Sequence, residues 1–354
     1  MQVISDLAEL DAKIAECNDA HASSDDAMRR LFQTFRMDFS SQLPADPFSP
    51  EYRDFQIALY ERIAGRKYSL QNERTALDPQ ASAARPFPYH TRSCTTTGYH
   101  LAAIGFLLRT LRLQPGARVL EFGPGWGNTT LALALLGMRV TAVDVEPNFC
   151  ELIRARAARE GVEIEVVQGD FFQAEAVTDP YDAVIFFECF HHCDDHMRLL
   201  RALHGAVRPG GDVYIASEPI LPNYPVPWGL RVDGEALWAI RNFGWMELGY
   251  DEGYFRAALA RTGWSATKHE CPDPDWAAVW HLRRADEAPV EATLVPDAPG
   301  VAAPKPAASA PASREPTGPG LAEAALAREL EAVYRSTSWR VTAPLRRLKR
   351  LLPG

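Results

Sequence analysis

Three glycines alternate in the stretch EFGPGWGNTT, at Gly123, Gly125 and Gly127, and a carboxylate, Glu121, lies just in front of them. Because glycine has no Cβ, the backbone of such a loop can come very close to a bound molecule. The loop follows the apolar run RVL, and a turn after the first strand of an open α/β sheet is a usual place for a ligand. The sequence therefore predicts a ligand-binding loop at residues 121–130.

Several ligands use such a loop, and two are disfavoured by the spacing. The dinucleotide pattern G-x-G-x-x-G requires glycine at position 128, where this chain has Asn128, and no G-K-[ST] follows as in a phosphate-binding Walker loop. Two carboxylates occur downstream, Asp144 after VTAV and Asp170 after VVQG. Each can accept charge-assisted hydrogen bonds from a ligand, and each can also cap a helix.

A second polar cluster, FFECFHHCDDH, follows the apolar run at 181–188. Glu188, His191 and His192 are the candidate catalytic residues, because the pKa of histidine suits a general base and carboxylates can also transfer protons. A structural role for either histidine is an equal alternative, and the sequence does not choose between His191 and His192.

The same cluster also contains cysteines and aspartates. Structural zinc sites usually pair two cysteines with a distant second pair of ligands, and no second pair occurs. We expect Asp194 and Asp195 to cap a helix rather than to bind magnesium. No metal site is therefore predicted.

An aromatic, proline-containing segment at 219–250 interrupts the pattern of strands and helices. Flat aromatic faces with polar neighbours suit a carbohydrate or another ring-shaped acceptor, whereas a lid with its own small core is the alternative. Two further candidates, Tyr89 and His90, precede the first predicted strand. Together with four residues of the insertion, they are the predicted acceptor-binding residues: Tyr89, His90, Trp228, Arg231, Trp238 and Trp245.

The elements that must position these residues follow from periodicity. Between about residues 86 and 284, short apolar β-branched runs alternate with segments of helical period that end at glycine. This alternation predicts an α/β fold with a Rossmann-like, doubly wound, seven-stranded and mostly parallel sheet. The seven predicted strands lie within 117–123, 138–144, 163–170, 181–188, 211–218, 264–271 and 276–285.

The composition divides the chain into further parts. Residues 1–85 have helical period, 285–320 are rich in alanine and proline as in a flexible linker, and 321–354 predict a helix followed by a basic amphipathic tail. The catalytic domain is predicted at 86–284, with 219–250 as its acceptor-binding insertion.

Charge and cysteine content restrict the class of protein. A formal net charge of -9 argues against a nucleic-acid partner, and six scattered cysteines suggest reduced thiols in the cytoplasm. No run of about 18 apolar residues occurs, so we expect neither a signal peptide nor a transmembrane helix.

Five motifs occur in order: RVLEFGPGWGNTT, VTAVDVEP, VVQGDFF, YDAVIFFECFHH and RPGGDVYIASEP. Together they resemble the class I S-adenosylmethionine-dependent methyltransferases, over roughly residues 90–284. The resemblance implies S-adenosyl-L-methionine as cofactor. It also implies that Glu121, Gly123, Gly125 and Gly127 form the loop beneath the methionine part of that cofactor.

The same resemblance gives roles to the downstream acids. Asp144 would accept hydrogen bonds from the ribose hydroxyls, Asp170 would face the adenine amino group, and Phe171 would lie beside the adenine ring. These roles agree with the strength of charge-assisted hydrogen bonds and with the positive charge of a sulfonium.

The segment STSWRVTAPLRRL at 336–348 resembles one that recurs in bacterial enzymes that build surface polysaccharides. With the aromatic insertion, it predicts O-methylation of a sugar of a surface glycan or its precursor. A small-molecule O- or N-methyltransferase of secondary metabolism and a catalytically silent scaffold of a glycan-assembly complex are the alternatives. The basic residues of 337–354 predict a peripheral site at the inner face of the membrane, or a protein partner.

Overall fold

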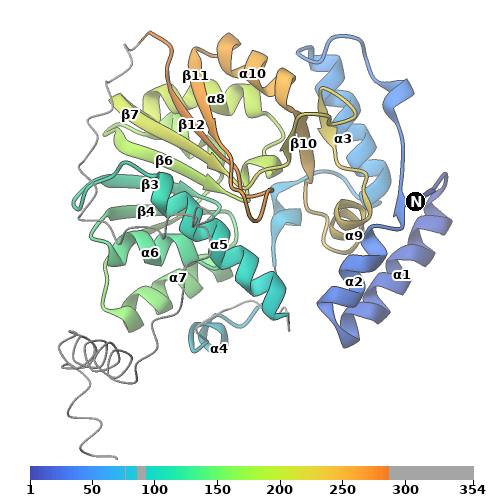
Figure 1. Ribbon diagram of the computed structural model, residues 1–354, viewed down its shortest axis with the longest axis horizontal. Coiled ribbons are helices and arrows are strands. Elements are labelled where there is room, and N and C mark those ends of the chain that lie inside the picture. Colours follow the sequence, from blue (N-terminus) through green and yellow to red (C-terminus); the bar gives the residue numbers. More distant parts are fainter. Residues whose placement is uncertain (76, 86–92, 287–354) are drawn as a thin grey trace, which may run out of the picture. The chain divides into compact units, whose positions relative to one another are not determined.

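The computed structural model describes residues 1–75, 77–85 and 93–286 (Figure 1). Residues 1–289 form one compact unit and 290–354 another. The second unit lies outside the described residues, as do the predicted tail and most of the predicted linker. Within the described residues, no helix combines the length and the apolar content needed to cross a membrane.

The core of the first unit is a seven-stranded sheet with the strand order β11-β12-β7-β6-β3-β4-β5. Strands β5, β4, β3, β6 and β7 pair in parallel, and β12 is antiparallel to both of its neighbours. The predicted fold class is thereby confirmed. The strands are β3 (Arg118–Phe122), β4 (Arg139–Asp144), β5 (Ile164–Gln168), β6 (Tyr181–Phe187), β7 (Val207–Ala216), β11 (Trp264–His269) and β12 (Val279–Arg284).

The pleat of the sheet divides its side chains between two apolar layers. On β6, Val184 and Phe186 belong to one buried cluster, and Ala183 and Ile185 belong to the other. The first cluster includes residues of α8 (His196–Ala206) and α10 (Glu252–Arg261), whereas the second includes residues of α5 (Cys94–Thr110) and α6 (Asn128–Leu135). Helix α7 (Pro147–Glu160) packs against β4 and β5.

Local sequence explains where these helices begin and end. The side chains of Asp195 and Asp251 accept hydrogen bonds from the backbone N–H groups that start α8 and α10. Helix α7 begins at Pro147 and ends at Gly161, whose φ of 68° is unfavourable for other residues.

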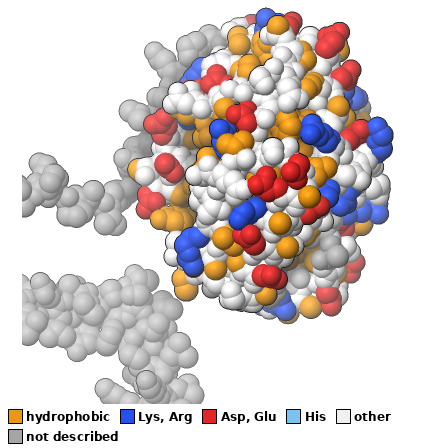
Figure 2. All heavy atoms as spheres, turned by 90° about the vertical axis from the view of Figure 1, so that its right-hand side faces the viewer, with side chains coloured by type: hydrophobic (Ala, Val, Ile, Leu, Met, Phe, Trp, Pro, Cys, Tyr) orange, Lys and Arg blue, Asp and Glu red, His pale blue; other side chains and the backbone are white. Residues whose placement is uncertain are grey.

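The N-terminal segment is largely helical, as predicted, and Pro50 starts one of its helices. Its elements are β1 (Gln2–Val3), α1 (Leu7–Ser23), α2 (Asp25–Phe32), β2 (Phe35–Arg36), η1 (Ser40–Gln42), α3 (Pro50–Ala64), η2 (Leu70–Glu73) and α4 (Pro79–Ala83). The outer face of this segment carries acidic and basic side chains interspersed with single hydrophobic ones (Figure 2).

The insertion folds into a small three-stranded sheet of order β8-β10-β9 and one helix. Its elements are β8 (Ile220–Leu221), β9 (Trp228–Leu230), α9 (Gly234–Asn242) and β10 (Leu248–Asp251). Helix α9 packs against α1, α2 and α3, beside the large sheet (Figure 1). The N-terminal segment and the insertion therefore form a single body, which we call the cap lobe (residues 1–75 and 219–251).

Candidate active site

A cavity of about 320 Å³ lies at the C-terminal ends of strands β3, β4, β5 and β6. One part of its wall consists of the turns that follow these strands, including the glycine loop. The other part comes from the cap lobe and α5, which contribute Leu70, Glu73, Thr75, His100 and Trp245. Parallel strands thus bring four of the five predicted motifs to one place, as expected for an open α/β sheet.

Two of the three loop glycines line this cavity. Gly123 has a φ of 57°, and a Cβ on it would lie 2.6 Å from the Cβ of Cys189, so only glycine fits there. Gly125 has a φ of 50°, but a Cβ on it would meet no protein atom within 4 Å. The space beside Gly125 therefore belongs to the cavity. Gly127 does not line the cavity and packs on Ile153 instead.

Asp144 ends β4 and is buried at the cavity wall. Its Oδ2 accepts a hydrogen bond from the N–H of Gly125 at 3.0 Å, and its Oδ1 accepts one from the N–H of Glu146 at 2.9 Å. Burial raises the pKa of Asp144 to about 6. The carboxylate therefore joins the glycine loop to the next strand and is also available to a bound molecule.

Asp170 and Phe171 also line the cavity. Asp170 accepts a hydrogen bond from the N–H of Phe172 at 2.8 Å and caps the short helix η3 (Phe171–Ala176). Capping and contact with a ligand are thus compatible for this residue.

Glu121 lies behind the loop and not among the cavity-lining residues. Its buried carboxylate accepts a hydrogen bond from the hydroxyl of Thr130 at 2.6 Å, and burial raises its pKa to about 7. This contact ties β3 to α6. A direct contact between Glu121 and the cofactor stays a prediction.

Trp126 is a bulky residue within the glycine loop, and the sequence alone did not explain its presence there. It lines the cavity, and its ring meets that of Phe149 edge-on, with the centroids 5.5 Å apart. Arg156 donates hydrogen bonds to the carbonyl of Trp126 and to the Oδ1 of Asn128. Asn128, which replaces the glycine of a dinucleotide motif, therefore helps to fix the loop.

The two adjacent histidines lie in the short helix η4 (Phe190–His192), and only His192 lines the cavity. Its Nδ1 is 2.6 Å from the carbonyl oxygen of Met246. Since a carbonyl can only accept, Nδ1 carries the proton and Nε2 keeps its lone pair. Burial, together with the charge of His191, holds the pKa of His192 well below its usual value. His192 is therefore a neutral imidazole that can accept a proton at Nε2.

His191 does not line the cavity. Its Nδ1 is 2.6 Å from the Oε2 of Glu218, and its Nε2 is 3.6 Å from the Oε2 of Glu247. Burial lowers the pKa of His191, but the two carboxylates outweigh this effect and the net shift is upward. His191 thus lies between two acidic side chains away from the cavity, and the geometry favours His192 over His191 as a general base.

The ring nitrogens of His191 and His192 and a carboxylate oxygen of Glu247 lie within 4.8 Å of one another. However, Arg231 Nη1 is already 3.5 Å from the Oε2 of Glu247. Glu247 is thus paired with a guanidinium, and His191 is bonded to Glu218. We therefore interpret this cluster as a network of hydrogen bonds and ion pairs.

Glu188, the third catalytic candidate, lines the cavity at the end of β6. Its φ of 53° is rare for a residue with a side chain, and its Oε2 is 3.3 Å from the Nδ1 of His100. Strained residues often occur at functional sites.

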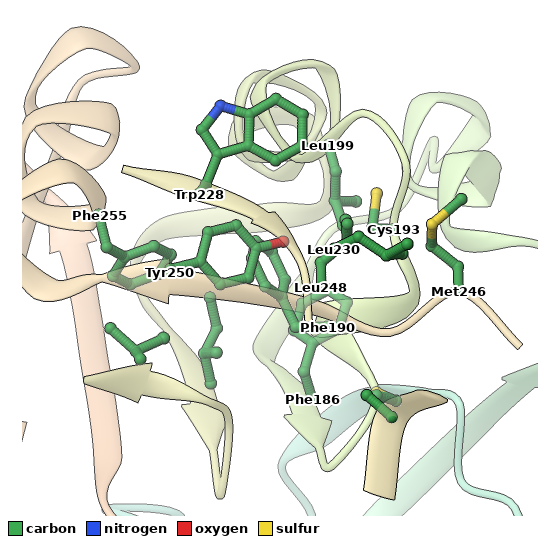
Figure 3. Packing of buried hydrophobic residues seen from close by; sticks show 14 of the residues in the cluster. Phe186, Phe190, Cys193, Leu199, Trp228, Leu230, Met246, Leu248, Tyr250 and Phe255 are labelled. Atoms are coloured by element: carbon green, nitrogen blue, oxygen red, sulfur yellow. The ribbon is translucent and has the colours of Figure 1, made fainter. Parts of the chain in front are cut away.

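Of the predicted acceptor-binding residues, Trp245 lines the cavity, where its ring stacks on that of Phe243. Trp228 is buried in the core of the cap lobe, opposite Tyr250 on the neighbouring strand (Figure 3), and its Nε1 donates to the carbonyl of Pro47. The lid interpretation of the insertion explains this residue better.

Trp238 and Arg231 also lie outside the cavity wall. The Nε1 of Trp238 donates to Asn18 of α1 at 2.7 Å, and Arg231 forms an ion pair with Asp233 at 3.0 Å. Both residues hold the insertion together or attach it to α1. Tyr89 and His90 lie outside the described residues.

Glu73 is a cavity residue that the sequence did not indicate. Its Oε1 accepts a hydrogen bond from the N–H of Met246 at 2.9 Å, and its Oε2 is 3.5 Å from the Nδ1 of His192. Burial raises the pKa of Glu73 well above its usual value. His100 was missed as well, since neither residue belongs to a recognisable motif.

Comparison with known proteins agrees with this geometry. The family model described as "Methyltransferase domain" matches residues 119–211. Relatives named "Ubiquinone biosynthesis O-methyltransferase" from Xanthomonas axonopodis pv. citri and Xanthomonas campestris pv. campestris are 33% and 32% identical. The matches cover 35% and 34% of this chain. The chain spans about half the length of these relatives, 51% and 49%.

Among solved structures, an S-adenosylmethionine-dependent methyltransferase from Mesorhizobium loti is similar to this chain, with 24% identity and a TM-score of 0.43. The similarity covers 53% of this chain and all of that one. The family match supports an S-adenosylmethionine-dependent methyltransferase domain over the motifs that line the cavity.

The residues present fit S-adenosylmethionine. The glycine loop leaves space beside Gly125, and Asp144 presents a buried carboxylate to the same space. Asp170 and Phe171 add a second carboxylate and an aromatic face. When bound, this cofactor supplies an electrophilic methyl group on a sulfonium.

Proposed function

We propose that this protein transfers a methyl group from S-adenosylmethionine to an oxygen of a small-molecule acceptor. One observation carries the proposal: His192, whose Nδ1–H is bonded to the carbonyl of Met246, lines the same cavity as Gly125 and Asp144. A hydroxyl that attacks a methyl group must lose its proton, and a positioned base accelerates such a step by about 10²- to 10⁴-fold.

The chain's own residues contribute binding, orientation and proton transfer. In our proposal, Asp144 and Asp170 hold the cofactor, while Leu70 and Trp245 restrict access of water to the acceptor. The acceptor proton moves to Nε2 of His192, whose Nδ1–H stays bonded to the carbonyl of Met246. Alignment of donor and acceptor in one cavity supplies most of the remaining acceleration.

The acceptor that we propose is a sugar hydroxyl of a bacterial surface glycan or its precursor. The ring of Trp245 at the cavity wall supports it, since aromatic faces suit sugar rings. The sequence at 336–348 supports it as well, although this segment lies outside the described residues. A small-molecule O-methyltransferase is the second candidate, favoured by the name of the relatives from Xanthomonas.

We further propose a cytoplasmic enzyme with no nucleic-acid partner, in which residues 337–354 bind the inner face of the membrane or a glycan-assembly partner. Deletion of 337–354 is then expected to lower binding to anionic vesicles without changing cofactor affinity. Equal binding of the full and the truncated chain to these vesicles would exclude the membrane.

Calorimetry with S-adenosylmethionine and its demethylated product tests the first step of the proposal. Absence of binding would leave a catalytically silent scaffold as the better interpretation. Incubation with methyl-labelled cofactor and fractionated bacterial extract then shows whether label enters glycan, lipid, protein or small molecules.

The base is tested by His192→Gln. We expect label transfer to fall at least 100-fold with unchanged cofactor affinity. The control is His204→Gln, since His204 bonds to the carbonyl of Thr262 and does not line the cavity. Transfer at the normal rate by the His192 variant would refute this role.

A further inference from the structure

Glu218 lies two residues after the end of β7, and its side chain is fully buried. Its Oε1 accepts hydrogen bonds from the N–H groups of Cys189 and Phe190, both at 2.8 Å. Its Oε2 is 3.1 Å from the N–H of His191 and 2.6 Å from the Nδ1 of the same residue. One carboxylate thus fixes the N–H groups of three consecutive residues, 189–191. We call residues 189–193 the histidine turn.

The backbone on both sides of this contact is strained. Glu188 enters the histidine turn with a φ of 53°, and Ser217 precedes Glu218 with a φ of 59°. Each such residue costs about 1–3 kcal/mol and persists only where the surroundings fix it. Four charge-assisted hydrogen bonds to Glu218 supply that constraint.

The insertion holds the opposite side of the histidine turn through two consecutive residues. Met246 accepts the Nδ1–H of His192 at its carbonyl, and its N–H donates to Glu73. Glu247 lies 3.6 Å from the Nε2 of His191. The histidine turn is therefore clamped between the end of β7 and the cap lobe.

We infer that Glu218 is a positioning residue that keeps His192 at the cavity wall in its Nδ1–H tautomer. The inference rests on the proposed function, in which His192 is the general base. Glu218 does not line the cavity, so it acts through its hydrogen bonds to the backbone of the histidine turn. The titratable and charged groups that surround the His191 ring are Glu218, Glu247, Arg231 and the neutral imidazole of His192.

The test compares Glu218→Gln with the wild type by nitrogen NMR of histidine-labelled protein at neutral pH. In the wild type we expect one sharp Nδ1–H tautomer for His192. The glutamine is uncharged. Its amide nitrogen can only donate, so it cannot replace one of the two carboxylate oxygens as a hydrogen-bond acceptor. We therefore expect the His192 signals of this variant to average between tautomers.

Activity provides a second readout. We expect Glu218→Gln to lower kcat about 10- to 100-fold while cofactor affinity stays within twofold, a split that general loss of structure would not produce. Glu160→Gln, at the end of α7, is the control and should match the wild type. A His192 signal and a kcat that are unchanged in Glu218→Gln would overturn the inference.

A second variant covers the case in which Glu218→Gln fails to fold. His191→Asn leaves the three backbone hydrogen bonds to Glu218 possible, so His192 should keep its tautomer. Loss of that tautomer in His191→Asn would show that the imidazole of His191, and not the Glu218 carboxylate, positions the turn. Because NMR needs no acceptor, these results are independent of whether methyl transfer itself is found.

Discussion

Replacing Asp144 by asparagine is expected to weaken cofactor binding strongly while leaving the fold intact. The two oxygens of Asp144 accept hydrogen bonds from Gly125 at 3.0 Å and from Glu146 at 2.9 Å. Asparagine keeps only one acceptor oxygen and has no charge, so it loses one of these bonds and the charge assistance for the ribose hydroxyls.

The magnitude follows from these contacts. A hydrogen bond to a charged group contributes about 1.5–3 kcal/mol, and about 1.4 kcal/mol corresponds to a tenfold change in affinity. We therefore expect Kd for S-adenosylmethionine to rise about 10- to 100-fold in Asp144→Asn. Calorimetry at pH 7.5 measures this change. The control is Glu165→Gln on β5, whose carboxylate accepts from Thr141 at 2.8 Å and does not line the cavity.

The pKa of Asp144 adds a second test of the same reasoning. Burial raises this pKa from 3.8 to about 6, so the carboxyl gains a proton as the pH falls through about 6. Cofactor affinity should decrease over that interval in the wild type and much less in Asp144→Asn. For folding the sign is opposite: the stabilising contribution of the protonated carboxyl is complete below pH 3.8 and is lost as the pH rises through about 6.

A folded Asp144→Asn protein with Kd within twofold of the wild type would refute the assignment of this residue to the cofactor. So would an equal loss of affinity in Glu165→Gln, because the effect would then not be specific to the cavity. Urea unfolding of both variants establishes that they are folded.

Two further predictions separate the cavity from its supports. Gly123→Ala should destabilise the protein by about 1–3 kcal/mol in urea unfolding, because its Cβ would lie 2.6 Å from that of Cys189. Gly125→Ala should be destabilised less than Gly123→Ala, because its Cβ would meet no protein atom within 4 Å. It should nevertheless bind the cofactor more weakly than the wild type. Equal unfolding midpoints for the two variants would contradict this reasoning. Trp228→Ala should lose about 3–5 kcal/mol of stability with unchanged cofactor affinity in the folded protein. Trp245→Ala should slow methyl transfer with a stability change below about 1 kcal/mol, and the reverse ranking of these two variants would be inconsistent with their places.

The sheet could be predicted because its signals are local. Strand β4 is a β-branched run that ends at Asp144, and β3 is bounded by the glycine loop, so each boundary lies within a few residues of the cue that predicts it. The part of the cavity that we assign to the cofactor is built from these strand ends. The sequence therefore predicted which strand ends meet at the cavity, and their contacts with the cofactor stay a prediction.

The acceptor-binding part could not be predicted, because it depends on contacts between distant residues. Trp228, Trp238 and Trp245 are indistinguishable by type and lie in one segment. Trp228 is buried because its Nε1 reaches Pro47, 181 positions away, and Trp238 bonds to Asn18 at a separation of 220. Only Trp245 is left at the cavity wall.

The different surroundings of the two adjacent histidines could not be predicted from the sequence either. His191 and His192 are adjacent and chemically identical, yet one lies between two buried carboxylates and the other borders the cavity. Their difference arises from the conformation of the histidine turn, which Glu218 fixes from β7 and Met246 fixes from the insertion. The insertion therefore has a positioning role besides any contact with the acceptor. Because the cap lobe also contributes Glu73, mutations that loosen it are expected to lower the rate of methyl transfer before they affect the binding of the cofactor.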